Sequence, residues 1–164
     1  MTELAIKDNP FFELSALECQ SPGPSYTVET LRRMRDLYRG DTLCLLLGLD
    51  AFLELPHWHR PRQLLALPDE VAVLARPGYS FLSLLESPFL ESTPSRDALW
   101  GLQEGRLRRL ELSLKGGRPL VALVITALDI SATRIRALIR QHGSTRYLLP
   151  PEVQSYIISN KLYL

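Results

Sequence analysis

Three apolar runs of strand length constrain the fold of this chain more than any other feature. They are TLCLLLGLD at 42–50, EVAVLAR at 70–76 and LVALVIT at 120–126. Apolar character that is almost unbroken over so few residues is the pattern of a strand buried on both faces of a parallel sheet. Helical segments between the runs supply the crossovers that parallel neighbours need. The pattern therefore predicts an α/β fold with a doubly wound parallel sheet.

The less apolar segments predict further elements. Residues 3–8 have the pattern of a helix that ends before Pro10, because proline disfavours helix at the residue before it. Residues 11–18 alternate enough to predict a strand. Residues 79–111 are less regular, and we expect helices or an insertion there.

Capping residues predict the limits of three more helices. One should follow Thr27, a good N-cap residue, and end at Gly40; another should follow Ser131 and run to Gln141, with Gly143 as its C′ residue. A short last helix is expected from Pro151, because proline is favoured at the first helical position.

Length and composition predict one globular domain over residues 1–164, with 46% hydrophobic residues. Nineteen Lys and Arg against eighteen Asp and Glu leave a net charge of +1, which argues against a nucleic-acid partner. No apolar run approaches the roughly 20 residues of a membrane span, and the N-terminus does not have the pattern of a signal peptide. We expect no membrane partner and a cytoplasmic location. Cys19 and Cys44 lack the spacing of a disulfide framework or a zinc site, and we expect reduced, structural thiols.

Ligands of open parallel sheets lie beyond the carboxyl ends of the strands, so the residues after the first apolar run are candidates. Gly48 would let a ligand approach the backbone, and Asp50 could accept hydrogen bonds from sugar hydroxyls or an amine. A plain turn followed by a helix cap explains the same two residues.

Trp58 follows in a segment without strong periodicity, flanked by His57 and His59 and followed by Arg60. Its indole could stack on a flat ring, and the nearby positive charge suits an anionic substrate. The alternative is a tryptophan at the edge of the core. No third ligand follows the two histidines at zinc-like spacing, so we expect no metal site.

Two helix N-termini could hold anions. Ser131, Thr133 and Arg134 or Arg136 converge where the last expected parallel strand leads into a helix, a setting that suits a phosphate. Thr27, at the start of another expected helix, could bind a substrate carboxylate together with the free backbone amides. Ordinary helix caps are the alternative at both places.

The order of these segments resembles that of the bacterial nicotinate-nucleotide adenylyltransferases. The resemblance rests on PSYT-x-x-T-L, G-x-D-x-x-x-x-L-x-x-W, R-P-G-Y, I-S-A-T-x-I-R and L-L-P-x-x-V-x-x-Y-I, which occur in register from about Glu3 to Tyr163. It implies a Rossmann-like nucleotidyltransferase fold and transfer of the adenylyl group of ATP to nicotinate mononucleotide in NAD biosynthesis. ATP with Mg²⁺ and nicotinate mononucleotide would be the small-molecule partners. The alternatives are a non-catalytic nucleotide-binding remnant and an adenylyltransferase with another acceptor.

The resemblance also implies residue roles. Thr27 and the backbone around Trp58 and His59 would meet the nicotinate carboxylate, with Trp58 stacked on the pyridine ring. Gly48 and Asp50 would contact the nucleotide portion. The ATP phosphates would lie against a third group, formed by Ser131, Thr133 and Arg136. Arg76, in the R-P-G-Y segment, would support the site.

The family opens with a strand, a G-G-x-F-D-P-x-H-x-G-H segment, a helix and a second strand, and this chain has no counterpart to them. The resemblance therefore assigns no catalytic residue here. Losing one such preorganised donor typically costs on the order of a hundred- to a thousandfold in rate, and losing two donors with the glycine-rich loop would cost more. Without its first two strands, the sheet should show an unpaired apolar edge between 11–18 and 42–50. We hypothesise an N-terminally truncated domain: a fragment, a misplaced start codon or a degenerate copy.

Overall fold

The computed structural model of the protein describes residues 1–20, 22–75, 78–126 and 128–163. The chain divides into two packed units, Met1–Gln20 with Leu128–Leu164, and Ser21–Ala127. The expectation of one domain over 1–164 stays a prediction.

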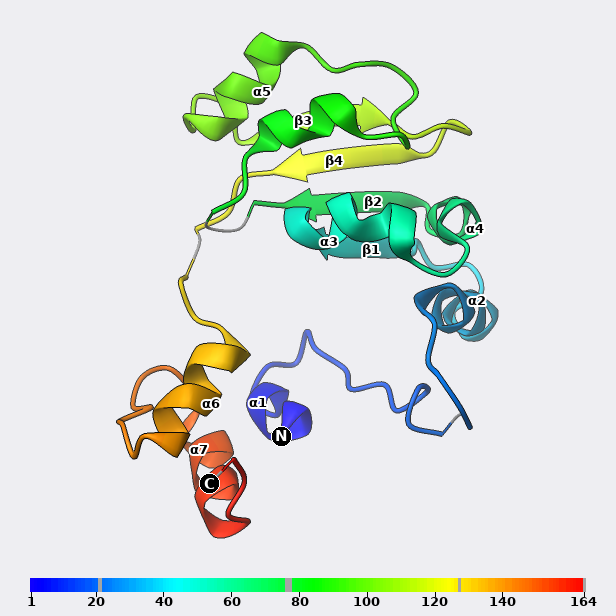
Figure 1. The fold of residues 1–164 in the computed structure, drawn as a ribbon. Helices are drawn as coiled ribbons and strands as arrows, with labels where there is room; N and C mark the ends of the chain where they lie inside the picture. Colours follow the sequence, from blue (N-terminus) through cyan, green and yellow to red (C-terminus); the bar gives the residue numbers. More distant parts are fainter. Residues whose placement is uncertain (21, 76–77, 127, 164) are drawn as a thin grey trace. The chain divides into compact units, whose positions relative to one another are not determined.

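The larger unit contains all four strands of the sheet and most of the helices (Figure 1). Its elements in chain order are α2 (Thr27–Leu37), β1 (Cys44–Gly48), α3 (Leu49–Glu54), the 3₁₀ helix η1 (Leu55–His57), α4 (Pro61–Ala66), β2 (Glu70–Leu74), the 3₁₀ helix η2 (Phe81–Glu86), α5 (Arg96–Gln103), β3 (Arg109–Ser113) and β4 (Pro119–Leu123).

The strands lie in the order β1-β2-β4-β3 (Figure 1). β1, β2 and β4 are parallel, with Leu46 opposite Ala72 and Ala72 opposite Val121. They are the three apolar runs, so the α/β fold with a parallel sheet is confirmed. The first run is shorter as a strand than the apolar pattern, because Leu49 already begins α3.

β3 was not foreseen; it begins at the end of the irregular stretch 79–111 and extends to Ser113. It pairs antiparallel with β4, with Leu110 opposite Ala122, and the intervening turn uses Gly116 and Gly117 at φ +98° and +79°. Glycine adopts these left-handed angles without steric penalty. The alternation in RLELS is the pattern of a strand with one solvated face, and its charged residues explain why it lacks the signature of the buried strands.

β1 lies at one edge of the sheet. Within the described residues it pairs only with β2, and the side chain of Leu46 is 63% exposed. The expected unpaired apolar edge is therefore present at this strand.

The prediction of a strand at 11–18 is wrong. These residues form turns and irregular backbone, and Phe11, Phe12 and Leu14 are exposed. A strand needs a neighbouring strand to pair with, and the four-stranded sheet of the described residues includes no strand from 11–18.

Several predicted helix limits shift by one to three residues, and α2 ends at Leu37 rather than at Gly40. Tyr26 is the N-cap of α2, and Thr27 is the first helical residue. The left-handed residue after the second helix, α6 (Ala132–Arg140), is His142 at φ +54°, whereas the N–H of Gly143 donates to the carbonyl of Leu138 at 2.7 Å. The predicted cap at Ser131 is confirmed, because its Oγ accepts from the N–H of Arg134 at 3.2 Å.

The core of the larger unit lies where α3, η1, η2 and α5 meet the sheet. α3 packs on β1 and β2, η2 packs on α5 and α3, and α5 packs on β3. The largest fully buried side chains include Leu49, Phe52, Leu55, Leu64, Val71, Phe81, Leu84, Leu99, Leu102, Leu114 and Leu120.

The smaller unit contains α1 (Thr2–Ile6), α6 and α7 (Pro151–Ser159). α1 packs on α7, and Lys7 forms a 3.2 Å ion pair with Glu152. The pKa of Glu152 lies below its usual value, first because its own backbone N–H donates to the carboxylate and second because of Lys7. The predicted helix from Pro151 is confirmed, with Val153 and Ile157 buried.

No helix in the described ranges has the length and apolar character needed to cross a membrane. Cys19 and Cys44 are both free thiols, and both are exposed.

Asp69 fixes α2 to the start of β1. Its Oδ2 accepts from the guanidinium of Arg35 at 2.8 Å and from the backbone N–H of Leu43 at 2.8 Å, and Arg118 lies 3.7 Å from its Oδ1. The hydrogen bond from Arg35 is the largest cause of the lowered pKa of Asp69, about 2, and the N–H of Leu43 is the next. The carboxylate form is therefore the one that the fold uses.

We predict that Asp69→Asn lowers the unfolding midpoint at neutral pH, because the ion pair is lost. A carboxyl group whose pKa is lower in the folded state stabilises the fold above its unfolded pKa of about 3.9, and the contribution disappears as the pH falls towards 2. Urea unfolding at several pH values between 6 and 2 should show the gap between wild type and variant closing below about pH 4. Asp36→Asn, in an exposed pair with Arg39, is the control and should change little. A gap of equal size at both ends of the pH range would contradict this role.

Candidate functional site

A cavity of about 300 Å³ lies beside the N-terminus of α2. It brings together three of the residues singled out in the sequence, namely Thr27, Trp58 and His59. The residues that line it are Ser25, Tyr26, Thr27, His57, Trp58, His59 and Leu64. Two segments far apart in the sequence, PSYT and PHWH, thus meet at one place in the larger unit.

The start of α2 supplies hydrogen-bond donors to this cavity. Tyr26 has extended backbone angles, and no side chain caps the helix. The backbone N–H groups of Thr27 and Val28 belong to the first turn and therefore have no acceptor within the helix. Together with the positive end of the helix dipole, these groups favour an anion such as a carboxylate.

The turn after η1 positions Trp58 and His59. Leu55 is fully buried, and its carbonyl accepts from the N–H of Trp58 at 3.0 Å. Arg60 then adopts left-handed backbone angles, φ 51° and ψ 54°, before Pro61 begins α4. Trp58 is partly buried and packs against the core while it also lines the cavity. Both sequence interpretations of Trp58 therefore apply in part.

Tyr26 and His59 form a stacked pair across the cavity wall, with ring centroids 4.1 Å apart and planes inclined by 27°. Sequence patterns assigned no role to Tyr26, although it lies within the PSYT segment. Its only sequence signal was its place beside Thr27. Its contact with His59 depends on how α2 lies against the turn after η1, and a local pattern cannot show that.

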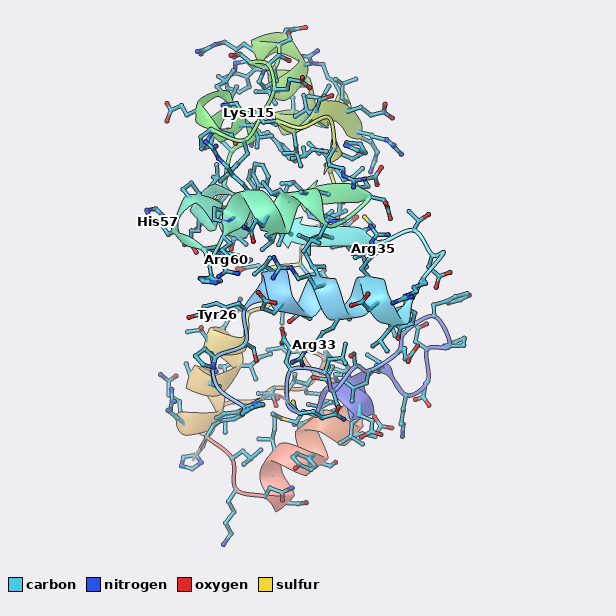
Figure 2. The ribbon with its side chains drawn as sticks, turned by 90° about the vertical axis from the view of Figure 1, so that its right-hand side faces the viewer. Tyr26, Arg33, Arg35, His57, Arg60 and Lys115 are labelled. Carbon is cyan, nitrogen blue, oxygen red and sulfur yellow. The ribbon has the colours of Figure 1, made fainter. Side chains whose placement is uncertain are left out.

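Charges gather beside the cavity. The carboxylate of Glu29 lies 2.7 Å from the guanidinium of Arg32 and 3.8 Å from that of Arg60. Figure 2 shows Tyr26, His57 and Arg60 at one end of α2. Two guanidinium groups around one carboxylate leave an excess positive charge here, which favours an anionic ligand.

Gly48 and Asp50 occupy the predicted position directly after a parallel strand. Gly48 ends β1 and is the N-cap of α3, and Asp50 lies half-buried in the first turn of that helix. An acidic residue is favoured in a first helical turn, so this position fits the helix-cap alternative. Neither residue lines the cavity beside α2.

Ser131, Thr133 and Arg136 belong to the smaller unit, at the N-terminus of α6. Arg134 is engaged locally, because its guanidinium donates to the carbonyl of Asp129 at 3.2 Å. Thr133 is exposed, and Arg136 makes no ion pair within the described residues. The helix start has the donors expected of an anion site.

Two further sequence predictions concern Arg76 as a supporting residue and the absence of a metal site. Arg76 lies outside the described residues. In the described ranges, no group of three or more His, Cys, Asp or Glu side chains is close enough to hold a metal ion.

Known proteins similar to this chain share one name, although no family model matches it. A protein of Dechloromonas aromatica is 42% identical over 166 residues, which span 99% of this chain and 72% of that protein. Proteins of Acidithiobacillus ferrooxidans and Thermus thermophilus are 36% and 34% identical over 163 residues, spanning 99% of this chain and 70% of each. All three carry the name "probable nicotinate-nucleotide adenylyltransferase".

The N-terminus of α6 allows a test of Ser131. Replacing an N-cap serine by alanine typically costs about 1 kcal/mol, because a first-turn N–H loses its acceptor. We predict that Ser131→Ala lowers the free energy of unfolding by about this amount, measured by urea unfolding. Ser144→Ala is the control, because the Oγ of Ser144 accepts only within an exposed turn, from the N–H of Arg146. Equal stability of Ser131→Ala and wild type would show that the cap does not hold the helix.

Proposed function

The chain belongs to the nicotinate-nucleotide adenylyltransferase family, and we propose on that basis that it serves the transfer of the adenylyl group of ATP to nicotinate mononucleotide. The products are nicotinate adenine dinucleotide, a precursor of NAD, and pyrophosphate. The phosphate of the mononucleotide attacks the α-phosphorus of ATP, the bond to the β-phosphate oxygen breaks, and pyrophosphate leaves with that bond's electron pair. We also propose a cytoplasmic location, where ATP is available.

The cavity beside α2 is the observation that supports this function most directly. A pyridine carboxylate has a flat ring and a negative charge, and the cavity offers an aromatic surface next to anion-binding groups. Trp58 stacks on the pyridine ring. Thr27 and the first backbone amides of α2 bind the carboxylate. The backbone at His59 contacts the same end of the pyridine ring. The guanidinium of Arg60 adds long-range attraction for the anion.

The remaining proposed roles concern ATP. Gly48 and Asp50 contact the nucleotide portion beyond the end of β1. Ser131, Thr133 and Arg136 hold phosphate oxygens at the start of α6, where helix amides and a guanidinium suit a polyanion. These groups act by positioning the substrates and balancing charge, as expected of a transfer without a covalent enzyme intermediate.

Mg²⁺ enters this proposal with ATP as part of the substrate. Magnesium is commonly held by substrate phosphates with one or two carboxylates, and it needs no cage made entirely of protein groups. The described residues form no such cage. No step of the proposed mechanism depends on a metal held by the protein alone, and no catalytic residue is assigned within the chain.

The reaction is tested by following pyrophosphate release with ATP, Mg²⁺ and nicotinate mononucleotide. The chain as it stands should be compared with a version extended at its N-terminus by the strand, G-G-x-F-D-P-x-H-x-G-H segment and helix of the family. We expect faster release from the extended version, because that segment supplies donors to the transferring phosphate. Absence of release from both versions, with nicotinate mononucleotide bound by neither, would reject the proposed function.

Binding of the mononucleotide tests Trp58 separately from turnover. We predict that Trp58→Ala weakens nicotinate mononucleotide binding about tenfold, because loss of stacking and ring burial removes on the order of 1–1.5 kcal/mol. ATP binding should change little. Isothermal titration with each ligand measures both affinities. Trp100→Phe, in α5 and outside the cavity, is the matched control. Unchanged affinity of Trp58→Ala for the mononucleotide would remove the stacking role.

A further inference from the structure

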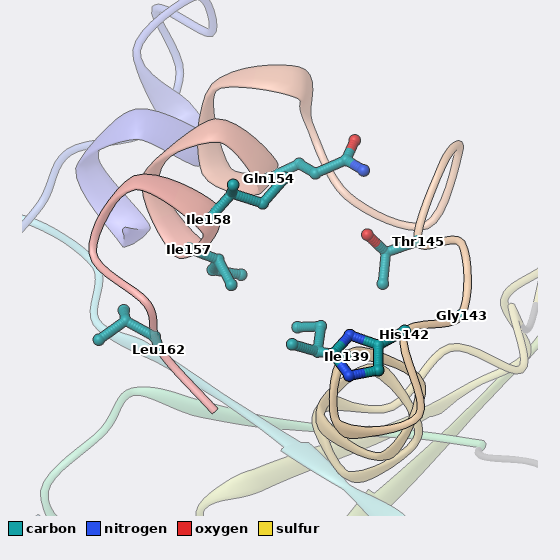
Figure 3. A pocket seen from close by; sticks show the side chains of 8 residues that line it. All are labelled: Ile139, His142, Gly143, Thr145, Gln154, Ile157, Ile158 and Leu162. Atoms are coloured by element: carbon teal, nitrogen blue, oxygen red, sulfur yellow. The ribbon is translucent and has the colours of Figure 1, made fainter. Parts of the chain in front are cut away.

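A second cavity lies wholly within the smaller unit, between the carboxyl-terminal half of α6 and α7 (Figure 3). Its volume is about 290 Å³. The residues that line it are Ile139, His142, Gly143, Thr145, Gln154, Ile157, Ile158 and Leu162. The phosphate-binding residues proposed above lie at the opposite end of α6, which at 1.5 Å per residue is about 13 Å away along the helix. This cavity is therefore separate from them.

Thr145 is the lining residue that most favours a ligand in this cavity. Its residue surface is 4% exposed, and it is the one buried polar residue in the described part of the chain. Its backbone carbonyl accepts from the N–H of Leu148 at 3.1 Å, and its side chain lines the cavity. A polar side chain in a mostly buried residue needs a hydrogen-bond partner. Because Thr145 lines the cavity, a molecule bound there could supply that partner.

Two more polar side chains face the same space. Figure 3 shows Gln154 from α7 and His142 from the end of α6 arranged with Thr145 around one open region. The backbone holds this arrangement. His142 adopts left-handed angles, and a Cβ on Gly143 would lie 3.1 Å from a side-chain atom and 3.3 Å from the carbonyl of Leu138. The close approach at Gly143 fixes the path of the turn that carries His142 and Thr145.

The chemistry of the lining selects the ligand class. Four aliphatic side chains, from Ile139, Ile157, Ile158 and Leu162, offer a surface for a flat ring. The lining contains no Asp, Glu, Lys or Arg, and His142 is the one lining side chain able to carry a positive charge, so a phosphate or carboxylate would have no permanently charged partner there. A hydroxyl and a carboxamide each donate and accept, which matches a molecule with both kinds of group on its edge.

We propose that this cavity binds an uncharged nitrogen heterocycle of nucleobase size, with its edge hydrogen-bonded to Thr145 and Gln154 and its face on the isoleucines. The ring is either a free base or the base of a nucleotide whose phosphate extends into solvent. This site is independent of the proposed adenylyl transfer, because its residues have no part in that reaction.

The NMR signals of the isoleucine methyl groups test whether a ring binds in this cavity. The chain has seven isoleucines, of which Ile139, Ile157 and Ile158 line the cavity and Ile6, Ile125, Ile130 and Ile135 do not. The full chain, labelled with ¹³C at isoleucine methyl groups, is titrated with adenine, adenosine monophosphate and toluene and followed by NMR. Adenine should shift the three cavity methyl signals saturably and leave the other four in place. Similar shifts with adenosine monophosphate identify the base of a nucleotide as an occupant, and their absence identifies the free base.

Thr145→Val separates the hydrogen bond from ring burial, because valine keeps the side-chain shape. We expect adenine affinity to fall about tenfold, since one hydrogen bond to a buried hydroxyl is lost. The unfolding midpoint of the free chain should stay equal or rise, because the buried hydroxyl is removed. Ser144→Ala, in the same turn but exposed, should leave adenine affinity unchanged. Unshifted cavity methyl signals, binding of toluene as tight as that of adenine, or unchanged adenine affinity in Thr145→Val would overturn the proposal.

Discussion

Parallel pairing of β1, β2 and β4 is the constraint on which the larger unit depends. Parallel neighbours cannot be joined by a tight turn, so each pair needs a crossover segment that packs on the sheet. The first crossover contains α3, η1 and α4, and it carries Gly48, Asp50 and the turn with Trp58. The position of that turn follows from the burial of Leu49, Phe52 and Leu55, which attach the crossover to the strands.

The side chains that line the cavity beside α2 are positioned by buried residues of the segments that carry them. Leu55 is buried before the turn and Leu64 after it, so the chain between them has fixed ends. The left-handed residue Arg60 reverses the backbone within that short distance. Trp58 both packs against the core and lines the cavity, and this packing limits its conformational freedom. Asp69, through Arg35 and Leu43, holds α2 where it completes the cavity.

Sequence patterns predicted the parts of the fold that a single segment determines. The three apolar runs became β1, β2 and β4, and the hydroxyl of Ser131 caps α6 as expected. The failures were elements whose state depends on a neighbour. Residues 11–18 alternate like a strand but pair with no strand of the sheet in the described residues, whereas RLELS became β3 because β4 lies beside it. β-propensity is strongly dependent on context, and these two segments differ in their context more than in their pattern.

The sequence by itself determined the order of the pocket-forming motifs, the identity of the buried strands and the family to which the chain belongs. Tertiary structure alone decided that Tyr26 stacks on His59, that two guanidinium groups surround Glu29, and that the hydroxyl of Thr145 opens into a cavity. The physical reason is the distance along the chain over which each kind of interaction acts. Periodicity and capping act over a few neighbouring residues, whereas ring stacking, ion pairing and burial depend on distances that exist only after separate elements have packed together.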